Sequence, residues 1–217
     1  NNVRKVIALS TDKAVNPVNL YGATKLASDK LFIAANNIVG KNKTRFSIVR
    51  YGNVIGSRGS VLPLFLNIKK KRKNFPITDL RMTRFWISLD EVVYFAIKSF
   101  RMMIGGEILI KKSPSIKIID LAKAINPKEK INIIGIRPGE KIHESLCSND
   151  DARYTIEYKN HYLIIPSIKL NINNSYLQNN LKEKGKKVKD PFEYNSGTNK
   201  DYLSVGKIER FLKKFSY

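Results

Sequence analysis

The order of hydrophobic and polar residues predicts strands and helices in alternation along the first part of the chain. An apolar run over residues 3–9 is typical of a buried strand, and the segment 20–38 has apolar residues near a 3.6-residue period, which predicts a helix. Asn19 is its expected N-cap, because its side chain can accept a hydrogen bond from the first turn. A second strand is predicted over 46–51, and a helix over 61–71 follows a glycine-bearing loop.

The second part of the chain repeats this alternation. The predicted elements are a helix over 89–103, a strand over 107–110, a helix over 118–125, a strand over 131–136, a short helix near 141–146, a strand over 161–165 and a helix over 205–215. Strands that alternate with helices are typical of a sheet whose parallel strands are joined by crossover helices. The pattern therefore predicts an α/β protein.

Composition adds one unusual property, a formal net charge of +22 on 217 residues. Such a charge is compatible with a nucleic-acid-binding module. However, the basic residues are spread along the chain and are not interleaved with stacking aromatic residues, so we favour a lysine-rich surface and expect no nucleic-acid partner. No apolar run is long enough to span a bilayer, so we expect no membrane association.

Cysteine and histidine usage narrows the function classes further. The single cysteine, Cys147, can form no internal disulfide, which fits a reducing cytoplasm. His143 and His161 lack metal-ligand spacing, and no second cysteine is available to join them. We therefore expect a cytoplasmic protein without a metal site.

The candidate chemistry lies between the first predicted strand and the helix that follows it. Tyr21 and Lys25 are four residues apart, so on a helix they lie on one face. A tyrosine is a poor base near neutral pH because its ordinary pKa is about 10, and a neighbouring ammonium group favours the phenolate. The polar segment 10–13 ends the strand, where the ligand crevice of an open α/β sheet lies. The pattern predicts proton transfer at this edge.

Five segments resemble a known family, both in their residues and in their order along the chain: STDKAVNPVNLYGATK (10–25), RYGNVIGSRGS (50–60), PITD (76–79), RMTRFW (81–86) and IGIRPGEK (134–141). They are similar to the inverting UDP-N-acetylglucosamine 4,6-dehydratases, which are extended short-chain dehydrogenases/reductases of the polysaccharide biosynthesis protein family. The resemblance continues more loosely to about residue 194. It implies the C-terminal half of a Rossmann-type parallel sheet plus a smaller α/β substrate-binding domain.

The resemblance implies catalytic roles for Asp12, Lys13, Tyr21 and Lys25. Tyr21 would take the proton of the sugar 4-hydroxyl, while Lys25 would hold the nicotinamide ribose and assist Tyr21. The resulting 4-ketone makes the C5 proton acidic, so Lys13 would remove that proton and Asp12 would protonate the departing 6-hydroxyl. Lys13 would act as a neutral amine, a state that nearby positive charge favours.

Lys13 and Tyr21 also separate related subfamilies. Retaining hexose dehydratases carry Glu where Lys13 stands, and long membrane-bound dehydratases carry Met where Tyr21 stands. The two residues together indicate the soluble, C5-inverting type, which begins pseudaminic acid synthesis for flagellin glycosylation. Two alternatives stay open: a nucleotide-sugar 4-epimerase, which needs no C5 base, and a non-catalytic basic fragment.

By the same resemblance the cofactor is NADP, the substrate is UDP-N-acetylglucosamine, and the full-length enzyme is a homo-oligomer. The implied cofactor-binding residues are Tyr21, Lys25, Val54, Ile55, Gly56, Ser57 and Arg58. The implied substrate-binding residues are Thr11, Asn53, Val61, Thr78, Arg137 and Glu140. An arginine suits a diphosphate because its guanidinium can bond two oxygens at once.

The dinucleotide-binding fingerprint G-x-G-x-x-G is absent from the sequence, and the chain opens inside a predicted strand. We therefore expect an N-terminally incomplete enzyme that is inactive as an isolated fragment. Residues 1–60 should form the C-terminal half of the NADP-binding domain, with 86–112 returning to it. Residues 61–85 and 113–217 should form the substrate-binding region and the C-terminal tail.

Overall fold

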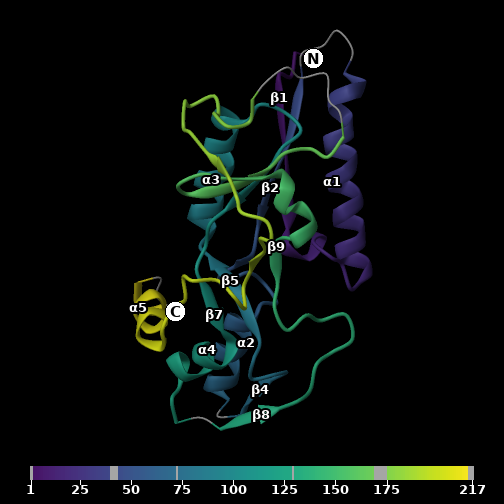
Figure 1. Ribbon diagram of the computed structural model, residues 1–217. Coiled ribbons are helices and arrows are strands. Elements are labelled where there is room, and N and C mark those ends of the chain that lie inside the picture. Colours follow the sequence, from purple (N-terminus) through teal and green to yellow (C-terminus); the bar gives the residue numbers. More distant parts are fainter. Residues whose placement is uncertain (1, 40–43, 72, 129, 169–174, 215–217) are drawn as a thin grey trace. The chain divides into compact units, whose positions relative to one another are not determined.

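The computed structural model describes residues 2–39, 44–71, 73–128, 130–168 and 175–214 (Figure 1). The chain forms two compact units, and each of them is assembled from three separate segments. Unit 1 comprises residues 1–51, 90–112 and 145–194, and unit 2 comprises residues 52–89, 113–144 and 195–217. No helix in the described part of the chain is long and apolar enough to cross a membrane.

Unit 1 is built on a sheet that has the strand order β1-β2-β6-β11-β10-β12 among the described residues. Its strands are β1 (Lys5–Thr11), β2 (Arg45–Tyr51), β6 (Ile108–Lys111), β10 (Thr155–Glu157), β11 (His161–Ile164) and β12 (Lys186–Lys187). β1, β2 and β6 are parallel, whereas β10, β11 and β12 join antiparallel. Parallel neighbours need a crossover connection, which explains why a helix lies between successive parallel strands along the chain.

Helices α1 (Leu20–Ile38) and α3 (Leu89–Met102) cover opposite faces of the parallel strands (Figure 1). Successive side chains of a strand point to opposite faces of a sheet. On β2, Arg50 accordingly faces α1, whereas Val49 packs in one cluster with Phe95 of α3. The parallel part of the sheet is thus covered on both sides, as its apolar strands require.

Unit 2 contains short strands and helices. Its strands are β3 (Asn53–Val54), β4 (Phe75–Ile77), β5 (Thr83–Ile87), β7 (Ser115–Lys117) and β8 (Ile131–Ile133), and its helices are α2 (Val61–Lys70), α4 (Ile118–Ile125) and α5 (Val205–Lys214). β5 pairs with β3 in parallel and with β7 antiparallel, and β4 pairs with β8 in parallel.

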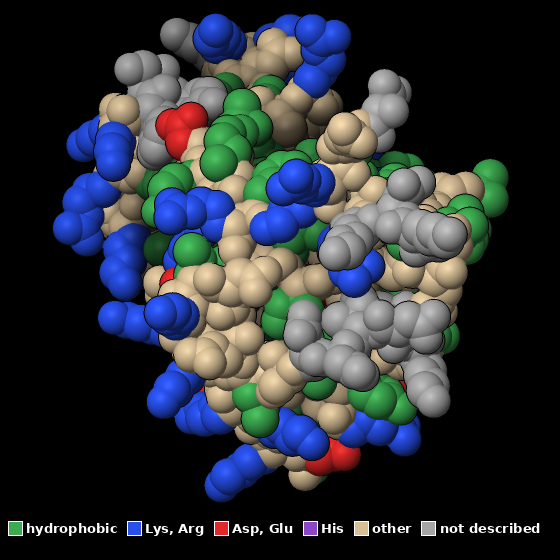
Figure 2. Space-filling model, turned by 90° about the horizontal axis from the view of Figure 1, so that it is seen from above, with side chains coloured by type: hydrophobic (Ala, Val, Ile, Leu, Met, Phe, Trp, Pro, Cys, Tyr) green, Lys and Arg blue, Asp and Glu red, His purple; other side chains and the backbone are tan. Residues whose placement is uncertain are grey.

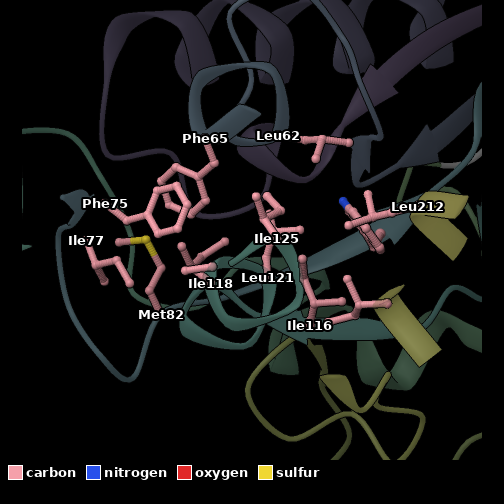
Figure 3. Close-up of a cluster of buried hydrophobic side chains, with 13 residues drawn as sticks. Leu62, Phe65, Phe75, Ile77, Met82, Ile116, Ile118, Leu121, Ile125 and Leu212 are labelled. Atoms are coloured by element: carbon pink, nitrogen blue, oxygen red, sulfur yellow. The ribbon is translucent and has the colours of Figure 1, made fainter. Parts of the chain in front are cut away.

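Apolar side chains from α2, α4, α5 and the strands form the core of unit 2 (Figure 3). Figure 3 shows Phe65 beside Phe75, and their ring centroids are 4.8 Å apart. Trp86 is buried in the same cluster, and its ring lies 5.1 Å from that of Phe211. Burial of one such side chain stabilises the folded state by about 1.5–3 kcal/mol, so this core can support the loops around it.

Most predicted helices and strands lie within two residues of the observed bounds, and α1 and α4 match them fully. The short helix predicted near 141–146 is wrong, because Ser145–Cys147 forms strand β9 and 141–144 is not helical. Ile142 and Leu146, four residues apart, mimic a helical period there. The strand predicted over 131–136 ends at Ile133, because Gly135 has a φ of 83° that no strand residue adopts. Phe215 lies outside the described residues.

The boundaries between the units differ from those that the sequence suggested. Residues 145–194 belong to unit 1, because β10, β11 and β12 extend its sheet; the 3-10 helix η2 (Asn149–Tyr154) lies in the same segment. Residues 52–60 belong to unit 2, because β3 pairs with β5. Strand β13 (Tyr194–Asn195) lies where the chain passes from unit 1 to unit 2.

Candidate active site

The end of β1 carries a buried carboxylate with an ammonium group beside it. The 3-10 helix η1 (Asp12–Ala14) follows β1 directly, and Thr11 is its N-cap. Asp12 is 0% exposed, and its Oδ1 accepts hydrogen bonds from Thr11 Oγ1 at 2.9 Å and from Lys13 Nζ at 3.0 Å. Oδ2 of Asp12 is buried without a hydrogen-bond partner among the described residues. One carboxylate oxygen is therefore left for a ligand group.

Helix α1 places Tyr21 and Lys25 on one face within its first two turns. Asn19 Oδ1 accepts a hydrogen bond from the backbone N–H of Gly22 at 2.8 Å, which confirms the predicted N-cap. Tyr21 is 56% exposed, and Lys25 Nζ donates to the carbonyl oxygen of Leu9 at 2.8 Å. A phenol and an ammonium group thus lie one turn apart at the start of the helix.

The first turn of α1 touches η1 at the level of the backbone. A Cβ atom at Gly22 would lie 2.3 Å from the carbonyl oxygen of Lys13 and 2.9 Å from Cβ of Pro17. No side chain fits there, so glycine is needed for this close approach. The contact brings the turn that carries Tyr21 against the turn that carries Asp12 and Lys13.

Tyr51, at the end of β2, is a neighbour of this cluster that sequence reasoning missed. Strand pairing sets it opposite Thr11. Burial raises the pKa of Tyr51, and the charge of nearby Tyr21 raises it further, so its phenol stays protonated near neutral pH. The sequence offered one indication of this role: Tyr51 ends a predicted strand, and ligand-binding residues gather at strand ends.

A buried polar cluster behind these residues was also missed. Ser10 of β1, Asp29 of α1 and Arg50 of β2 are 2%, 2% and 3% exposed and are joined by hydrogen bonds. Spacing could have found one member, because Asp29 continues the series of Tyr21 and Lys25 four residues further on.

In unit 2 the residues expected at the cofactor, Val54 to Arg58, form the end of β3 and the turn before α2, which begins at Val61. Gly56 has a φ of 72°, which favours glycine in this turn. Asn53 Oδ1 and Ser60 Oγ are buried without a hydrogen-bond partner among the described residues. Orphaned buried polar atoms cost free energy unless a ligand satisfies them, so this segment fits a polar ligand.

The expected substrate residues Arg137 and Glu140 share a loop of unit 2. The backbone N–H of Arg137 donates to Glu140 Oε2 at 3.4 Å, and the side chain of Arg137 is exposed. Arg84 supports this loop: its Nη1 donates to the carbonyl oxygen of Ile142 at 3.0 Å, and its Nη2 lies 3.8 Å from Glu140 Oε1. The loop can therefore present Arg137 to an anionic group.

Thr78 has the least access of the expected substrate residues. It is 6% exposed, and its Oγ1 donates to Met82 Sδ at 3.2 Å. The adjacent Asp79 accepts hydrogen bonds from the side chain of Arg81, which lower the pKa of Asp79 to about 2. These residues form a hydrogen-bonded turn, and only Arg81 reaches far into solvent.

One face of the molecule carries basic side chains in several places (Figure 2). The face in Figure 2 shows Lys and Arg side chains in separate places with few acidic ones between them, as 40 basic and 18 acidic residues lead one to expect. Among the described residues no group of three or more His, Cys, Asp or Glu could hold a metal ion.

Known proteins resemble this chain in sequence and in structure. It is 60% identical over 201 residues to the UDP-N-acetylglucosamine 4,6-dehydratase (inverting) of Campylobacter jejuni, a match that covers 92% of the chain and 60% of that relative. It is 45% identical over 168 residues to the UDP-glucose 4-epimerase of Rickettsia bellii, which covers 76% of the chain and 49% of that relative. The crystal structure of Pen from Bacillus thuringiensis superposes with a TM-score of 0.83 at 32% identity and covers 99% of the chain and 64% of Pen.

The chain spans 60% of the length of the Campylobacter relative that it matches. The structural likeness to Pen confirms the α/β fold that the alternation of strands and helices predicted. A family model described as polysaccharide biosynthesis protein matches residues 1–166, which is most of the chain. The chain therefore belongs to the polysaccharide biosynthesis protein family.

Proposed function

We propose that the chain carries the acid–base residues and part of the sugar site of a nucleotide-sugar 4,6-dehydratase. The reaction would convert UDP-N-acetylglucosamine to a UDP-4-keto-6-deoxy-L-arabino-hexulose with inversion at C5, the first step of pseudaminic acid synthesis. The observation that carries the proposal is the hydrogen bond of 3.0 Å between Lys13 Nζ and the buried Asp12 carboxylate, directly beside the turn of Tyr21. A 4-epimerase has no use for such a pair.

The Asp12–Lys13 pair can become an acid and a base by the movement of one proton. Transfer from Lys13 Nζ to Asp12 Oδ1 along their hydrogen bond turns the ion pair into a neutral amine and a carboxylic acid. The amine then takes the C5 proton of the 4-keto sugar, and the acid protonates the 6-hydroxyl. The C6–O bond breaks, water leaves and a C5=C6 double bond forms, so the elimination balances.

Tyr21 and Lys25 would serve the step that makes the ketone. The Tyr21 phenolate would take the proton of the 4-hydroxyl, and the Lys25 ammonium group would favour that phenolate. Both polar groups lie on one face of α1, where Tyr21 is exposed and Lys25 is partly exposed, and such a pair suits the two hydroxyls of a nicotinamide ribose. Tyr21, Lys25 and Val54 to Arg58 would hold NADP, which would supply the hydride acceptor at C4 and the hydride donor at C6. Hydride addition at C6 leaves an enolate, and a solvent-derived proton delivered to C5 from the opposite face completes the product with inverted configuration.

The remaining roles follow the same proposal. Thr11 would contact the sugar beside Asp12, whereas Asn53, Val61, Thr78, Arg137 and Glu140 would contact the nucleotide sugar from unit 2. The orphaned Asn53 Oδ1 and the exposed Arg137 support this assignment most directly. We further propose a cytoplasmic homo-oligomer, with no nucleic-acid or membrane partner.

The deciding experiment incubates the protein, at its full natural length, with UDP-N-acetylglucosamine and NADP in deuterated water. We expect a 4-keto-6-deoxy product with deuterium at C5 and inverted configuration there, read by NMR. A product that keeps its 6-hydroxyl, or that retains the C5 configuration, would contradict the proposal. The same assay with NAD in place of NADP tests the cofactor assignment.

The Rickettsia bellii relative named UDP-glucose 4-epimerase makes 4-epimerisation the second candidate. An epimerase would return the hydride to C4, so the product would keep its 6-hydroxyl and carry no deuterium at C5. The two reactions are thus separated by the same NMR spectrum.

Lys13→Ala tests the base directly. Loss of a general base slows the step that it serves by about 10²–10⁴-fold, so we expect elimination to be almost abolished while UDP-sugar affinity changes little. Lys30→Ala, which removes an exposed lysine of the same unit on α1, is the matched control and should leave turnover unchanged. Full turnover in Lys13→Ala would remove Lys13 from the mechanism.

The missing dinucleotide fingerprint leads to a separate proposal about the 217-residue chain alone. Pyrophosphate groups bind where backbone N–H groups of a glycine-rich turn meet a helix N-terminus, and no such sequence is present. We expect the isolated chain to show no measurable NADP(H) affinity by titration calorimetry and no turnover. Tight binding would overturn this expectation.

A further inference from the structure

The face of α1 that carries Tyr21 and Lys25 continues to a third polar residue, Asp29. Its side chain is 2% exposed. Its Oδ2 accepts a hydrogen bond from Ser10 Oγ at 2.8 Å and another from Arg50 Nη2 at 3.0 Å. Hydrogen bonds to a charged group are stronger than neutral ones, and more so when they are buried. The hydrogen bonds from Ser10 on β1 and Arg50 on β2 therefore hold the Asp29 carboxylate in place.

The elements that this cluster joins are those that carry the proposed acid–base residues. Ser10 lies on β1, two residues before Asp12, and Asp29 lies on the helix of Tyr21 and Lys25. Arg50 lies on β2, and its Nη1 donates to the carbonyl oxygen of Leu146 on β9 at 3.0 Å. One buried carboxylate therefore sets where the end of β1 lies along α1.

The turn after η1 is packed on one side only: Ala14 and Val15 are 1% and 4% exposed, whereas Asn16 is exposed. A cavity of about 200 Å³ in unit 1 is lined by residues Ala14 to Pro17 of this turn and by Asp29 and Arg50. Asn16 in the turn has a φ of 45°, which is uncommon outside glycine. The cavity leaves room for this turn to shift, and Asp29 and Arg50 of the cluster lie on the wall of the same cavity.

We infer that Asp29, together with Ser10 and Arg50, is a positioning residue that holds the Asp12–Lys13 pair in register with Tyr21 and Lys25. The inference rests on the proposed function. Without the cluster, Tyr21 still makes the 4-ketone, but the base reaches C5 less often. Formation of the ketone and elimination of water then become uncoupled.

Ser10→Ala is the test variant, because it removes one hydrogen bond to Asp29 and leaves the Arg50–Asp29 ion pair in place. Ser99→Ala is the matched control: Ser99 is also buried, and its Oγ donates one hydrogen bond, to the carbonyl oxygen of Phe95 at 2.7 Å. Both variants lose one buried hydroxyl of unit 1, so a general loss of stability affects them alike.

The first measurement compares oxidation with elimination in the protein at its full natural length. In Ser10→Ala we expect elimination to slow by about tenfold or more, since small displacements of a catalytic group have effects of that size. Reduced cofactor should then accumulate during turnover and be visible by its absorbance, whereas Ser99→Ala should behave as wild type. A merely structural defect would lower both steps in proportion, and that result would overturn the inference.

The second measurement needs no cofactor and no activity. Hydrogen exchange followed by mass spectrometry should show faster exchange over 10–19 in Ser10→Ala and unchanged exchange over β2 and β6. Equal exchange in wild type and Ser10→Ala would also overturn the inference. If wild type makes no 4-keto-6-deoxy product, the proposed function fails instead, and the exchange result still reports whether the cluster fixes the turn.

Discussion

Each unit contains an arginine–aspartate pair, and the two pairs are similar in distance but different in surroundings. In unit 1, Arg50 Nη2 lies 3.0 Å from Asp29 Oδ2, and the two side chains are 4% and 2% exposed. In unit 2, Arg81 Nη2 lies 2.7 Å from Asp79 Oδ2, and the side chains are 69% and 16% exposed. The shorter of the two distances belongs to the pair that water screens more.

Sequence separation sharpens the contrast. Asp29 and Arg50 are 21 residues apart and join a helix to a strand, whereas Asp79 and Arg81 are two residues apart and shape one turn. An exposed pair contributes little to the free energy of unfolding, but removal of one partner from a buried pair leaves an uncompensated charge in the interior. Burial and sequence separation, rather than the N–O distance, therefore distinguish the expected effects of the two pairs on stability.

Arg50→Met should lower the free energy of unfolding more than any other substitution at these two pairs. Methionine fills a similar volume but leaves the Asp29 carboxylate buried without its cation, which costs about 3–5 kcal/mol of unfolding free energy. Urea unfolding followed by far-UV circular dichroism measures this loss.

Arg81→Met is the control for that experiment, because it makes the same substitution at the exposed pair. Its unfolding midpoint should move much less than that of Arg50→Met, because solvent screens this pair. Similar losses in both variants would show that burial is not what distinguishes the two pairs.

His161 on β11 extends the comparison to a buried titratable group that is neutral. It is 2% exposed, stacks on Tyr158 with ring centroids 4.4 Å apart, and its pKa falls from 6.5 to about 4 because of burial. The unfolded chain takes up a proton near pH 6.5 and the folded protein only near pH 4. The free energy of unfolding is therefore greatest above about pH 6.5. It falls by up to about 3 kcal/mol as the pH is lowered towards 4.

His161→Phe should keep the ring stacking and remove this part of the acid sensitivity. The measurement is the urea midpoint of wild type and variant between about pH 7.5 and pH 4.5, a window set by the depressed histidine pKa. Parallel curves for the two proteins would contradict the assignment.

The smallest expected effect is a change in the pKa of one carboxyl group at the protein surface. Hydrogen bonds from Arg81 lower the pKa of Asp79 from 3.8 to about 2. In Arg81→Met the pKa of Asp79 should rise towards its ordinary value, as carboxyl carbon NMR across an acid titration would show. An unchanged titration would mean that Arg81 does not hold Asp79 in solution.

Local signals explain what the sequence made predictable. The helical period and the Asn19 cap predict α1 at Leu20–Ile38. The helical period alone predicts α4, because its apolar residues recur with that period. The residues 10–25 could be assigned to one site because strand end, turn and helix are continuous in the chain. Such features depend on residues that are close together in the chain, so they can be recognised in a single sequence.

Features that depend on distant residues were missed. β4, β5 and β7 are short strands whose partners lie up to tens of residues away, so no local period marks them. The segment that contains β9 was predicted as a helix, because Ile142 and Leu146 have helical spacing and no local pattern marks so short a strand. The hydrogen bond between Asp29 and Arg50 joins two elements that only the folded sheet brings together. Tyr51 near Tyr21 likewise follows from strand pairing and not from spacing.

The close approach of Gly22 to the carbonyl oxygen of Lys13 has a consequence for protein engineering. A designer who transfers the start of α1, with Tyr21 and Lys25, to another scaffold must transfer the preceding turn with it, because only glycine fits between the two. The helix start is shaped to the turn before it, and Asp29 anchors both to the strand that carries Ser10. The transferred segment would therefore run from Ser10 to Asp29, and the neighbouring strand would need an arginine to pair with Asp29.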